Sequence, residues 1–241
     1  MFFGIDPIYF VFLAPAMLLA GWASWRVRRA YAAAAEVRPA SGFTGAEAAE
    51  AILDRNGLTG VRIEPADGFL SDHYDPTEKV LRLSPDVYAG RSLAALGIAA
   101  HEAGHALQDA GGYPLLRVRN GIVPLAAVGG NVSWVLILAG FLLAAGGSLL
   151  GTWLIWLGIA AFSLTVLFQL VNLPVEFDAS RRARKVLAGL GLVNRGEAPA
   201  VRRVLSAAAL TYVAATLGSV LTLAYFLFRA GVLGGSEREE V

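Results

Sequence analysis

The stretch Leu142-Leu-Ala-Ala-Gly-Gly-Ser-Leu-Leu-Gly-Thr-Trp153 lies inside a run, residues 120–175, that contains no charged side chain. About 20 apolar residues are enough to cross a bilayer, so this run is too long for a single transmembrane helix. Gly146-Gly147-Ser148 divides the run, because paired glycines mark turns. The sequence therefore predicts a transmembrane helical hairpin, with helices at roughly Ile122–Ala145 and Leu149–Val171.

Two further apolar segments lie outside this hairpin. Pro7–Trp25 carries no charge and is followed by arginines, and Val204–Phe228 lies between Arg203 and Arg229. The first segment could instead be a signal peptide, but no positive charge precedes it, so an uncleaved anchor is the better interpretation. A hydrophobic content of 56% and a mean hydropathy of +0.57 support membrane insertion. We expect a mostly α-helical membrane protein with four transmembrane helices.

The distribution of Lys and Arg predicts how the chain is oriented. All but two of the 20 such residues fall within residues 26–119 or 181–203, and the two exceptions are Arg229 and Arg238. The positive-inside rule therefore places both basic segments in the cytoplasm and both termini outside. We expect a multi-pass protein of the inner or plasma membrane. Its parts are an N-terminal anchor (1–25), a cytoplasmic domain (26–120), the hairpin (121–172), a cytoplasmic segment (173–203), a last transmembrane helix (204–229) and an external polar tail (230–241).

The composition excludes several classes of function. A net charge of +1 gives no basic field that would attract nucleic acid. The chain has no cysteine, which excludes disulfides, thiolate metal sites and cysteine nucleophiles. The four apolar segments lack ionisable residues, which argues against an ion or proton pathway through the membrane.

Short elements are expected in the cytoplasmic domain. Thr44-Gly-Ala-Glu47 has the spacing of a capping box and predicts a helix that ends near Gly57. Strands are expected at Val61–Glu64 and Val80–Leu83, with a turn at residues 75–78. A further helix should begin at about Ser92 and end near Asp109, ahead of two glycines.

His101-Glu-Ala-Gly-His105 lies on that last helix. Positions i and i+4 share one helix face, so His101 and His105 can hold one Zn²⁺. Glu102 is then placed to act as the general base that activates water, as in zinc peptidases. The alternative is that the motif is an incidental match without a metal. It would leave three polar side chains on an apolar helix without partners, and burying them in that state costs free energy.

A catalytic zinc site needs a third protein ligand. His73 precedes the motif, and nothing in the sequence fixes its distance from the metal. Asp109 is one turn beyond His105 and is expected to face along the helix. Because the hairpin crosses the membrane and returns, Glu176 lies on the same side as the histidines and can reach the metal. The alternative is that Glu176, just after Pro174, is a carboxylate at a helix N-terminus, where the helix dipole stabilises it. Asp178 lies about 200° round a helix from Glu176 and has a weaker claim.

Three blocks of sequence carry a family resemblance. They are Ser71-Asp-His-Tyr-Asp-Pro76, Ala100-His-Glu-Ala-Gly-His-Ala-Leu-Gln108 and Pro174-Val-Glu-Phe-Asp-Ala-Ser-Arg-Arg-Ala183. Together they resemble the bacterial YugP-like neutral zinc metallopeptidases, distantly similar to HtpX-like gluzincin membrane peptidases, over nearly the whole chain. The resemblance implies a zincin-like α+β metallopeptidase domain that binds one Zn²⁺ through His101, His105 and Glu176, with Glu102 as the catalytic base.

One position departs from the wider gluzincin pattern. Ser180 stands where that pattern has an aspartate that would orient a ligating histidine. The orienting partner in this chain is therefore either weaker or supplied by another residue. Gln108 and Tyr113 lie close to the motif in sequence but have no assignable role.

We therefore expect an integral membrane zinc-dependent endopeptidase whose substrate is a peptide or membrane protein. His73 or Tyr74 is a candidate donor to the oxyanion, against an alternative in which both belong to a polar turn before Pro76. The substrate is expected to add as a strand beside Val80–Leu83. A rival hypothesis is a catalytically inactive, zinc-stabilised membrane module that binds partner proteins.

Overall fold

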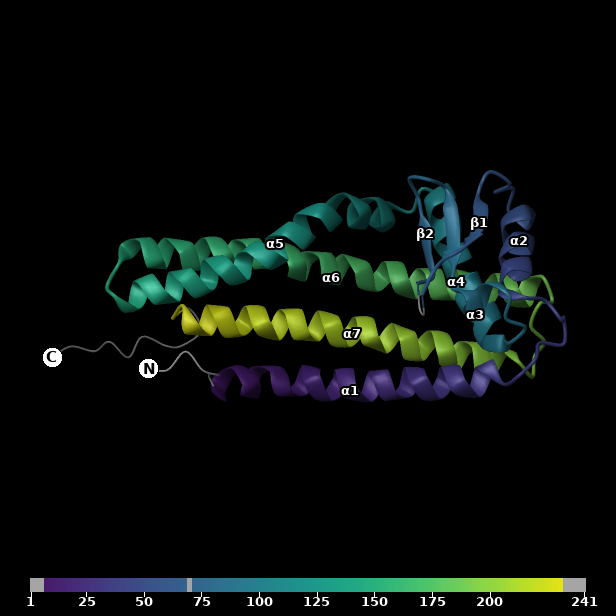
Figure 1. Ribbon diagram of the computed structural model, residues 1–241, viewed down its shortest axis with the longest axis horizontal. Coiled ribbons are helices and arrows are strands. Elements are labelled where there is room, and N and C mark those ends of the chain that lie inside the picture. The colour runs from purple at the N-terminus through teal and green to yellow at the C-terminus, as the bar shows by residue number, and fades with distance from the viewer. Residues whose placement is uncertain (1–6, 69–70, 232–241) are drawn as a thin grey trace. The chain divides into compact units, whose positions relative to one another are not determined.

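The computed structural model describes residues 7–68 and 71–231 and is mostly helical (Figure 1). Residues 232–241 of the predicted external tail and residues 1–6 of the anchor lie outside this range. The elements in chain order are α1 (Pro7–Ala35), α2 (Gly45–Arg55), β1 (Arg62–Pro65), β2 (His73–Asp75), β3 (Val80–Leu83), α3 (Pro85–Tyr88), α4 (Leu93–Ala110), α5 (Pro114–Ala145), α6 (Leu149–Gly189) and α7 (Ala198–Arg229).

Helices α1, α5, α6 and α7 are each long and apolar enough to cross a membrane. They expose large hydrophobic side chains, among them Val11 at 72% and Trp153 at 74%, as expected of surfaces that meet lipid rather than water. The predicted hairpin is confirmed, because α5 ends at Ala145 and α6 begins at Leu149. Gly147 between them has φ +77°, a conformation that glycine adopts without strain.

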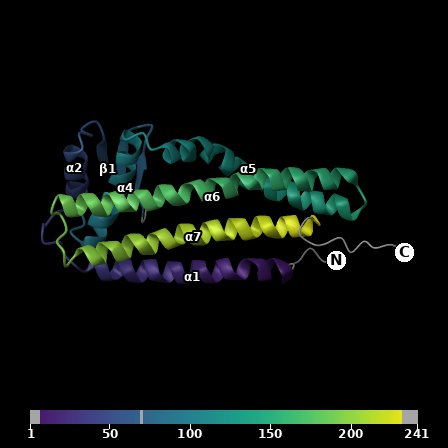
Figure 2. The ribbon, with the colours of Figure 1, turned by 180° about the vertical axis from the view of Figure 1, so that it is seen from behind.

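The long helices extend well beyond the apolar stretches. The segment 173–203, predicted to separate two transmembrane helices, is itself mostly helical, because α6 continues unbroken to Gly189 and α7 begins at Ala198 (Figure 2). Apolar length limits how much helix a bilayer can hold, but it does not end a helix. The helix ends only where the chain reaches Gly191, whose φ is +67°. Pro174 therefore lies inside α6, and Glu176 is not at a helix N-terminus.

The chain divides into two compact units. The first contains Met1–Gly21, Val118–Leu173 and Tyr212–Val241, and its described part consists of helix segments. Aromatic side chains pack edge to face within it, with ring centroids of Trp134 and Phe226 5.2 Å apart. Gly140 and Gly151 allow α5 and α6 to approach closely, because a Cβ at Gly151 would lie 2.3 Å from the backbone nitrogen of Ala144.

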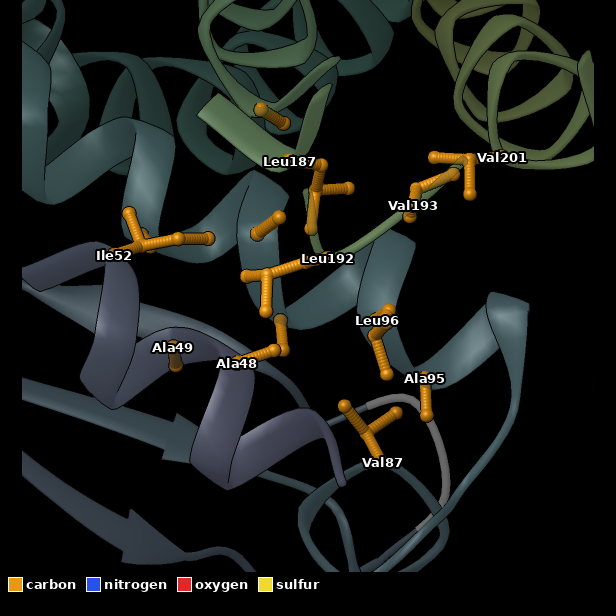
Figure 3. Packing of buried hydrophobic residues seen from close by; sticks show 14 of the residues in the cluster. Ala48, Ala49, Ile52, Val87, Ala95, Leu96, Leu187, Leu192, Val193 and Val201 are labelled. Atoms are coloured by element: carbon orange, nitrogen blue, oxygen red, sulfur yellow. The ribbon is translucent and has the colours of Figure 1, made fainter. Parts of the chain in front are cut away.

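The second unit contains Trp22–Arg117 and Pro174–Thr211. Its sheet has the order β1-β3-β2, with β3 parallel to β1 and antiparallel to β2. The core is built from α2, α4, β3 and the parts of α6 and α7 in this unit. It includes Ile52, Leu96 and Leu187, each no more than 1% exposed (Figure 3).

Strand β3 is the central strand of the sheet. A substrate strand cannot add beside Val80–Leu83 as predicted, because both edges of β3 are already paired, with β1 and with β2. The edges left in this sheet belong to β1 and β2. Strand order depends on pairing between segments distant in sequence, and the local pattern of residues 80–83 could not reveal it.

Several local predictions for this unit are confirmed. The capping box of Thr44 and Glu47 is complete and starts α2. The Asp75 carboxylate accepts hydrogen bonds from the backbone of Thr77 and Glu78, which fixes the predicted turn. Ser92 caps α4, whose 18 residues carry the His-Glu-x-x-His motif.

Candidate metal centre

Helix α4 places His101 and His105 on one face. Their ring centroids lie 4.9 Å apart, one helical turn from each other. The apolar side of the helix packs into the core, where Leu96, Ala99, Ala100 and Ala103 are fully buried. The two imidazoles are only slightly exposed, with side chains 14% and 11% accessible. Both rings are therefore mostly buried on a helix that is anchored by its apolar side.

Helix α6 brings Glu176 to this pair. Its Oε2 lies 3.2 Å from Nε2 of His101 and 3.7 Å from Nε2 of His105, and the residue is 3% exposed. One donor atom from each of the three residues lies within 4.8 Å of the others. Two ligands of a tetrahedral zinc ion at about 2.0–2.2 Å are themselves about 3.3 Å apart, so this donor set fits the ion.

The other sequence candidates do not join this cluster. His73 is exposed on β2, and its Nδ1 lies 2.7 Å from the backbone oxygen of Ser71. Asp109 accepts hydrogen bonds from Tyr74 and Lys79 instead, in agreement with its expected direction. Asp178 forms ion pairs with Arg181 and Arg182.

Gln108 determines the tautomer of His105. Its Nε2 donates to the backbone oxygen of Val175 at 2.8 Å and to Asp178 Oδ2 at 3.0 Å, so its Oε1 must be the atom 3.0 Å from Nδ1 of His105. Because an amide oxygen only accepts, that Nδ1 carries the proton. In the neutral imidazole the lone pair is then on Nε2, the nitrogen that lies 3.7 Å from Glu176 Oε2 and would bind a metal ion. Sequence reasoning missed this role, since it depends on contacts between α4 and α6.

Ser180 occupies the corresponding place beside His101. Its Oγ lies 3.1 Å from Nδ1 of His101, while Nε2 of the same ring faces Glu176. The sequence left open whether the partner that orients this histidine is weaker than an aspartate or supplied by another residue. The structure supports the first alternative, because the uncharged Ser180 itself is the partner. A hydroxyl orients the imidazole but raises its basicity less than a carboxylate would.

Comparison with known proteins bears on the nature of this site. Residues 9–231 match the family described as "Putative neutral zinc metallopeptidase". The chain belongs to this family. It is also 48% identical over 219 residues to a protein of Bacillus subtilis (strain 168) described as "Putative membrane protease YugP", covering 90% of this chain and 95% of that protein. No solved structure gives a significant match. The resemblance inferred from the three sequence blocks is thus confirmed.

The electrostatics of the centre suit a cation, as this zinc metallopeptidase family would require. Burial alone would raise the pKa of Glu176, but hydrogen bonds and charges from His101 and His105 hold it well below its usual range. Burial alone would lower the pKa of His105, yet the hydrogen bond with Glu176 and the charges of Glu102 and Glu176 raise it. Glu176 is therefore ionised at neutral pH, which is the form that binds metal.

Glu102 is the unpaired carboxylate of the centre. Within the described residues, its carboxylate has no hydrogen bond or ion pair, although its charge acts on the buried His105. It is partly exposed, one residue after His101. No described residue therefore competes for this carboxylate.

A second set of contacts ties the sheet to the same helix. The Tyr74 hydroxyl on β2 donates to Asp109 Oδ2 at 2.8 Å, and Lys79 Nζ lies 2.5 Å from the same oxygen. Burial, with the hydrogen bond to Asp109, raises the pKa of Tyr74 above its usual range. The Tyr74 hydroxyl is thus committed to Asp109, whereas the His73 imidazole on the same strand is exposed.

Gly104 lets α4 and α6 come together at the centre. A Cβ at this position would lie 2.7 Å from the backbone oxygen of Ala179, which is itself fully buried. Gly104 stands between the two histidines, and Ala179 is three residues after Glu176. The close approach of the two backbones therefore sets the distance between the imidazoles and the carboxylate.

Gly104→Ala is expected to weaken both stability and metal binding. The added methyl group forces α4 and α6 apart, and such overpacking costs about 1–3 kcal/mol. Tm and zinc affinity, measured by competition with a chromophoric chelator, should both fall. Gly97→Ala is the control on the same helix, because its Cβ would meet only Val201 Cγ1 at 3.3 Å. Equal zinc affinity in the two variants would contradict this role for Gly104.

Proposed function

We propose that this chain is an integral membrane zinc-dependent endopeptidase. The observation that carries the proposal is the cluster of His101, His105 and Glu176, with the unpaired carboxylate of Glu102 on the same helix. Membership of a zinc metallopeptidase family and four helices that could span a membrane support it. The donor set of two imidazoles and one carboxylate is of the gluzincin type.

The chain's own residues would divide the reaction between them. A zinc ion bound by His101, His105 and Glu176 would supply Lewis acidity, lowering the pKa of water to about 7 and polarising the scissile carbonyl. Gln108 and Ser180 hold the two imidazoles with Nε2 directed at the cluster. Glu102 accepts the proton of the attacking water and delivers it to the leaving amine. His73 is proposed as the donor to the oxyanion.

The peptide substrate would bind along an open edge of the sheet. Extended peptides add to exposed strand edges through backbone hydrogen bonds. Of the two edge strands, β2 is favoured, because Tyr74 links it through Asp109 to the helix that carries the metal motif. His73 lies on this strand and would contribute its exposed imidazole there.

The active site is proposed to face the cytoplasm. The support is the bias of Lys and Arg toward residues 26–119 and 181–203, which the positive-inside rule assigns to the cytoplasmic side. His101 and His105 fall within the first of these segments, and Glu176 lies shortly before the second. The substrate would then be a cytoplasmic peptide or a membrane protein segment exposed on that side.

Metal removal tests the proposal directly. Treatment of the purified protein with 1,10-phenanthroline followed by dialysis should abolish cleavage of an unfolded, fluorescein-labelled protein, and one equivalent of Zn²⁺ should restore it. The reason is that Glu102 alone cannot activate water at a useful rate at neutral pH.

Two outcomes would count against the peptidase. Full cleavage by zinc-free protein would overturn the metal mechanism. Stoichiometric zinc that raises Tm, with no cleavage of any peptide library, would instead favour the inactive zinc-stabilised module. That rival is consistent with the bonds that join α4 to α6 at the cluster.

A further inference from the structure

A cavity separate from the metal centre lies where α6 ends and α7 begins. It has a volume of about 300 Å³ and is lined by the last turns of α6, the loop after it and the first turn of α7. Leu187, Val193 and Val201 contribute apolar side chains to this lining, and each is at most 5% exposed. None of the metal-centre residues lines this cavity. It is therefore a distinct feature of the second unit.

Three arginines, Arg184, Arg195 and Arg202, also line the cavity. Nε of Arg184 donates to the backbone oxygen of Ser180, which is a neutral partner. Among residues 7–68 and 71–231, no carboxylate forms an ion pair with any of the three guanidinium groups. The cavity lining thus carries three exposed guanidinium groups without an ion-pair partner among the described residues.

The two acidic residues nearest to the cavity arginines in sequence, Asp178 and Glu197, have other partners. Asp178 is paired with Arg181 and Arg182. The Glu197 carboxylate accepts hydrogen bonds from the backbone of Ala40 at 2.7 Å and of Asn194 at 2.9 Å. Neither carboxylate forms an ion pair with a cavity arginine, so the three guanidinium groups remain open to an external anion.

We propose that this arginine-lined cavity binds a small amphipathic anion, a phosphate or carboxylate group carried on a compact apolar body. Guanidinium groups recognise phosphate and carboxylate oxygens through paired, charge-assisted hydrogen bonds. Ligand pockets combine a mostly apolar lining with a few polar groups that fix orientation, and this cavity has that combination. The ligand can be a soluble metabolite or the headgroup region of an anionic lipid, and both share this chemistry.

The simpler explanation is that these arginines only form part of a basic segment beside the membrane. Lys185 and Arg203 allow the two explanations to be separated. Each is adjacent in sequence to a cavity arginine and is exposed, as the cavity arginines are, but neither lines the cavity. A general surface attraction would treat the two pairs alike, whereas a built site would not.

Calorimetric titration of the full-length, zinc-loaded protein in an uncharged detergent tests the proposal. The probes are phenyl phosphate as a soluble anion, dihexanoyl phosphatidic acid as a lipid, and dihexanoyl phosphatidylcholine as the zwitterionic control. In Arg195→Gln/Arg202→Gln, we expect the anionic probes to bind roughly tenfold more weakly or worse, the loss expected for charge-assisted hydrogen bonds. Lys185→Gln/Arg203→Gln removes the same charge and should bind as the wild type does.

Ala188→Leu provides a second test that keeps every charge. Ala188 lines the cavity, so a larger side chain there takes up its volume and should reduce binding of both anionic probes. Binding of phosphatidic acid without phenyl phosphate would identify lipid as the source, and binding of both would identify a soluble anion as sufficient. The proposal is overturned if neither probe binds, or if the two double variants weaken binding equally.

Discussion

Glu176→Ala is expected to yield a purified protein that contains almost no zinc, against one ion per chain in the wild type. The substitution removes the anionic donor and leaves two imidazoles, fewer than the three protein ligands of catalytic zinc sites. It also removes the hydrogen-bond partner of Nε2 of His101, at 3.2 Å in the structure. Zinc content by inductively coupled plasma mass spectrometry, after gel filtration in detergent, is the measurement.

A matched control makes this result specific. Glu50→Ala removes a carboxylate that is exposed on α2, outside the donor cluster, and should retain full zinc. Circular dichroism should show that both variants keep their helical content. Undiminished zinc in Glu176→Ala would mean that the third ligand is wrongly assigned, and His73 would be the next residue to test.

Glu102→Gln is expected to keep zinc and to lose cleavage. The amide has nearly the size of the carboxylate but cannot accept a proton, and general base catalysis contributes about 10²–10⁴-fold in rate. The three donors are untouched, so the zinc content should equal that of the wild type. Single-turnover cleavage of the labelled substrate, measured beside zinc content on the same sample, separates the two effects.

The pair of variants is more informative than either alone. Zinc lost in Glu176→Ala and retained in Glu102→Gln, with cleavage absent from both, would assign one carboxylate to binding and the other to chemistry. Cleavage retained by Glu102→Gln at the wild-type rate would remove Glu102 from the mechanism. Zinc lost in both variants would point to a shared structural role instead.

Sequence reasoning worked best where the signal is local. The capping box at Thr44 and the glycine turn at Gly147 depend on residues a few positions apart, and the structure has both. The start of α4 at Ser92 is a cap of the same kind. Glu176 was reached by a different argument, that the hairpin returns the chain to its starting side. The structure brings that carboxylate to His101 and His105.

The features that the sequence did not reveal depend on contacts between distant segments. The role of Gln108 requires Val175 and Asp178, which are 67 and 70 residues away in the chain. The central position of β3 requires it to pair with β1, although β2 lies between these two strands in the sequence. The continuation of α6 beyond Val171 was missed because an apolar stretch indicates where a helix can lie in the bilayer, and not where that helix ends. None of these leaves a periodic or compositional pattern.

The separation of the donors along the chain has a consequence for biosynthesis. His101 and Glu176 are 75 residues apart, and all of α5 and the apolar part of α6 are made between them. During translation the histidine pair is completed first, and the carboxylate follows only after both arms of the hairpin exist. A nascent or truncated chain that stops before Glu176 therefore has an incomplete donor set. Under the function proposed above, cleavage would begin only after α5 and the apolar part of α6 have been synthesised.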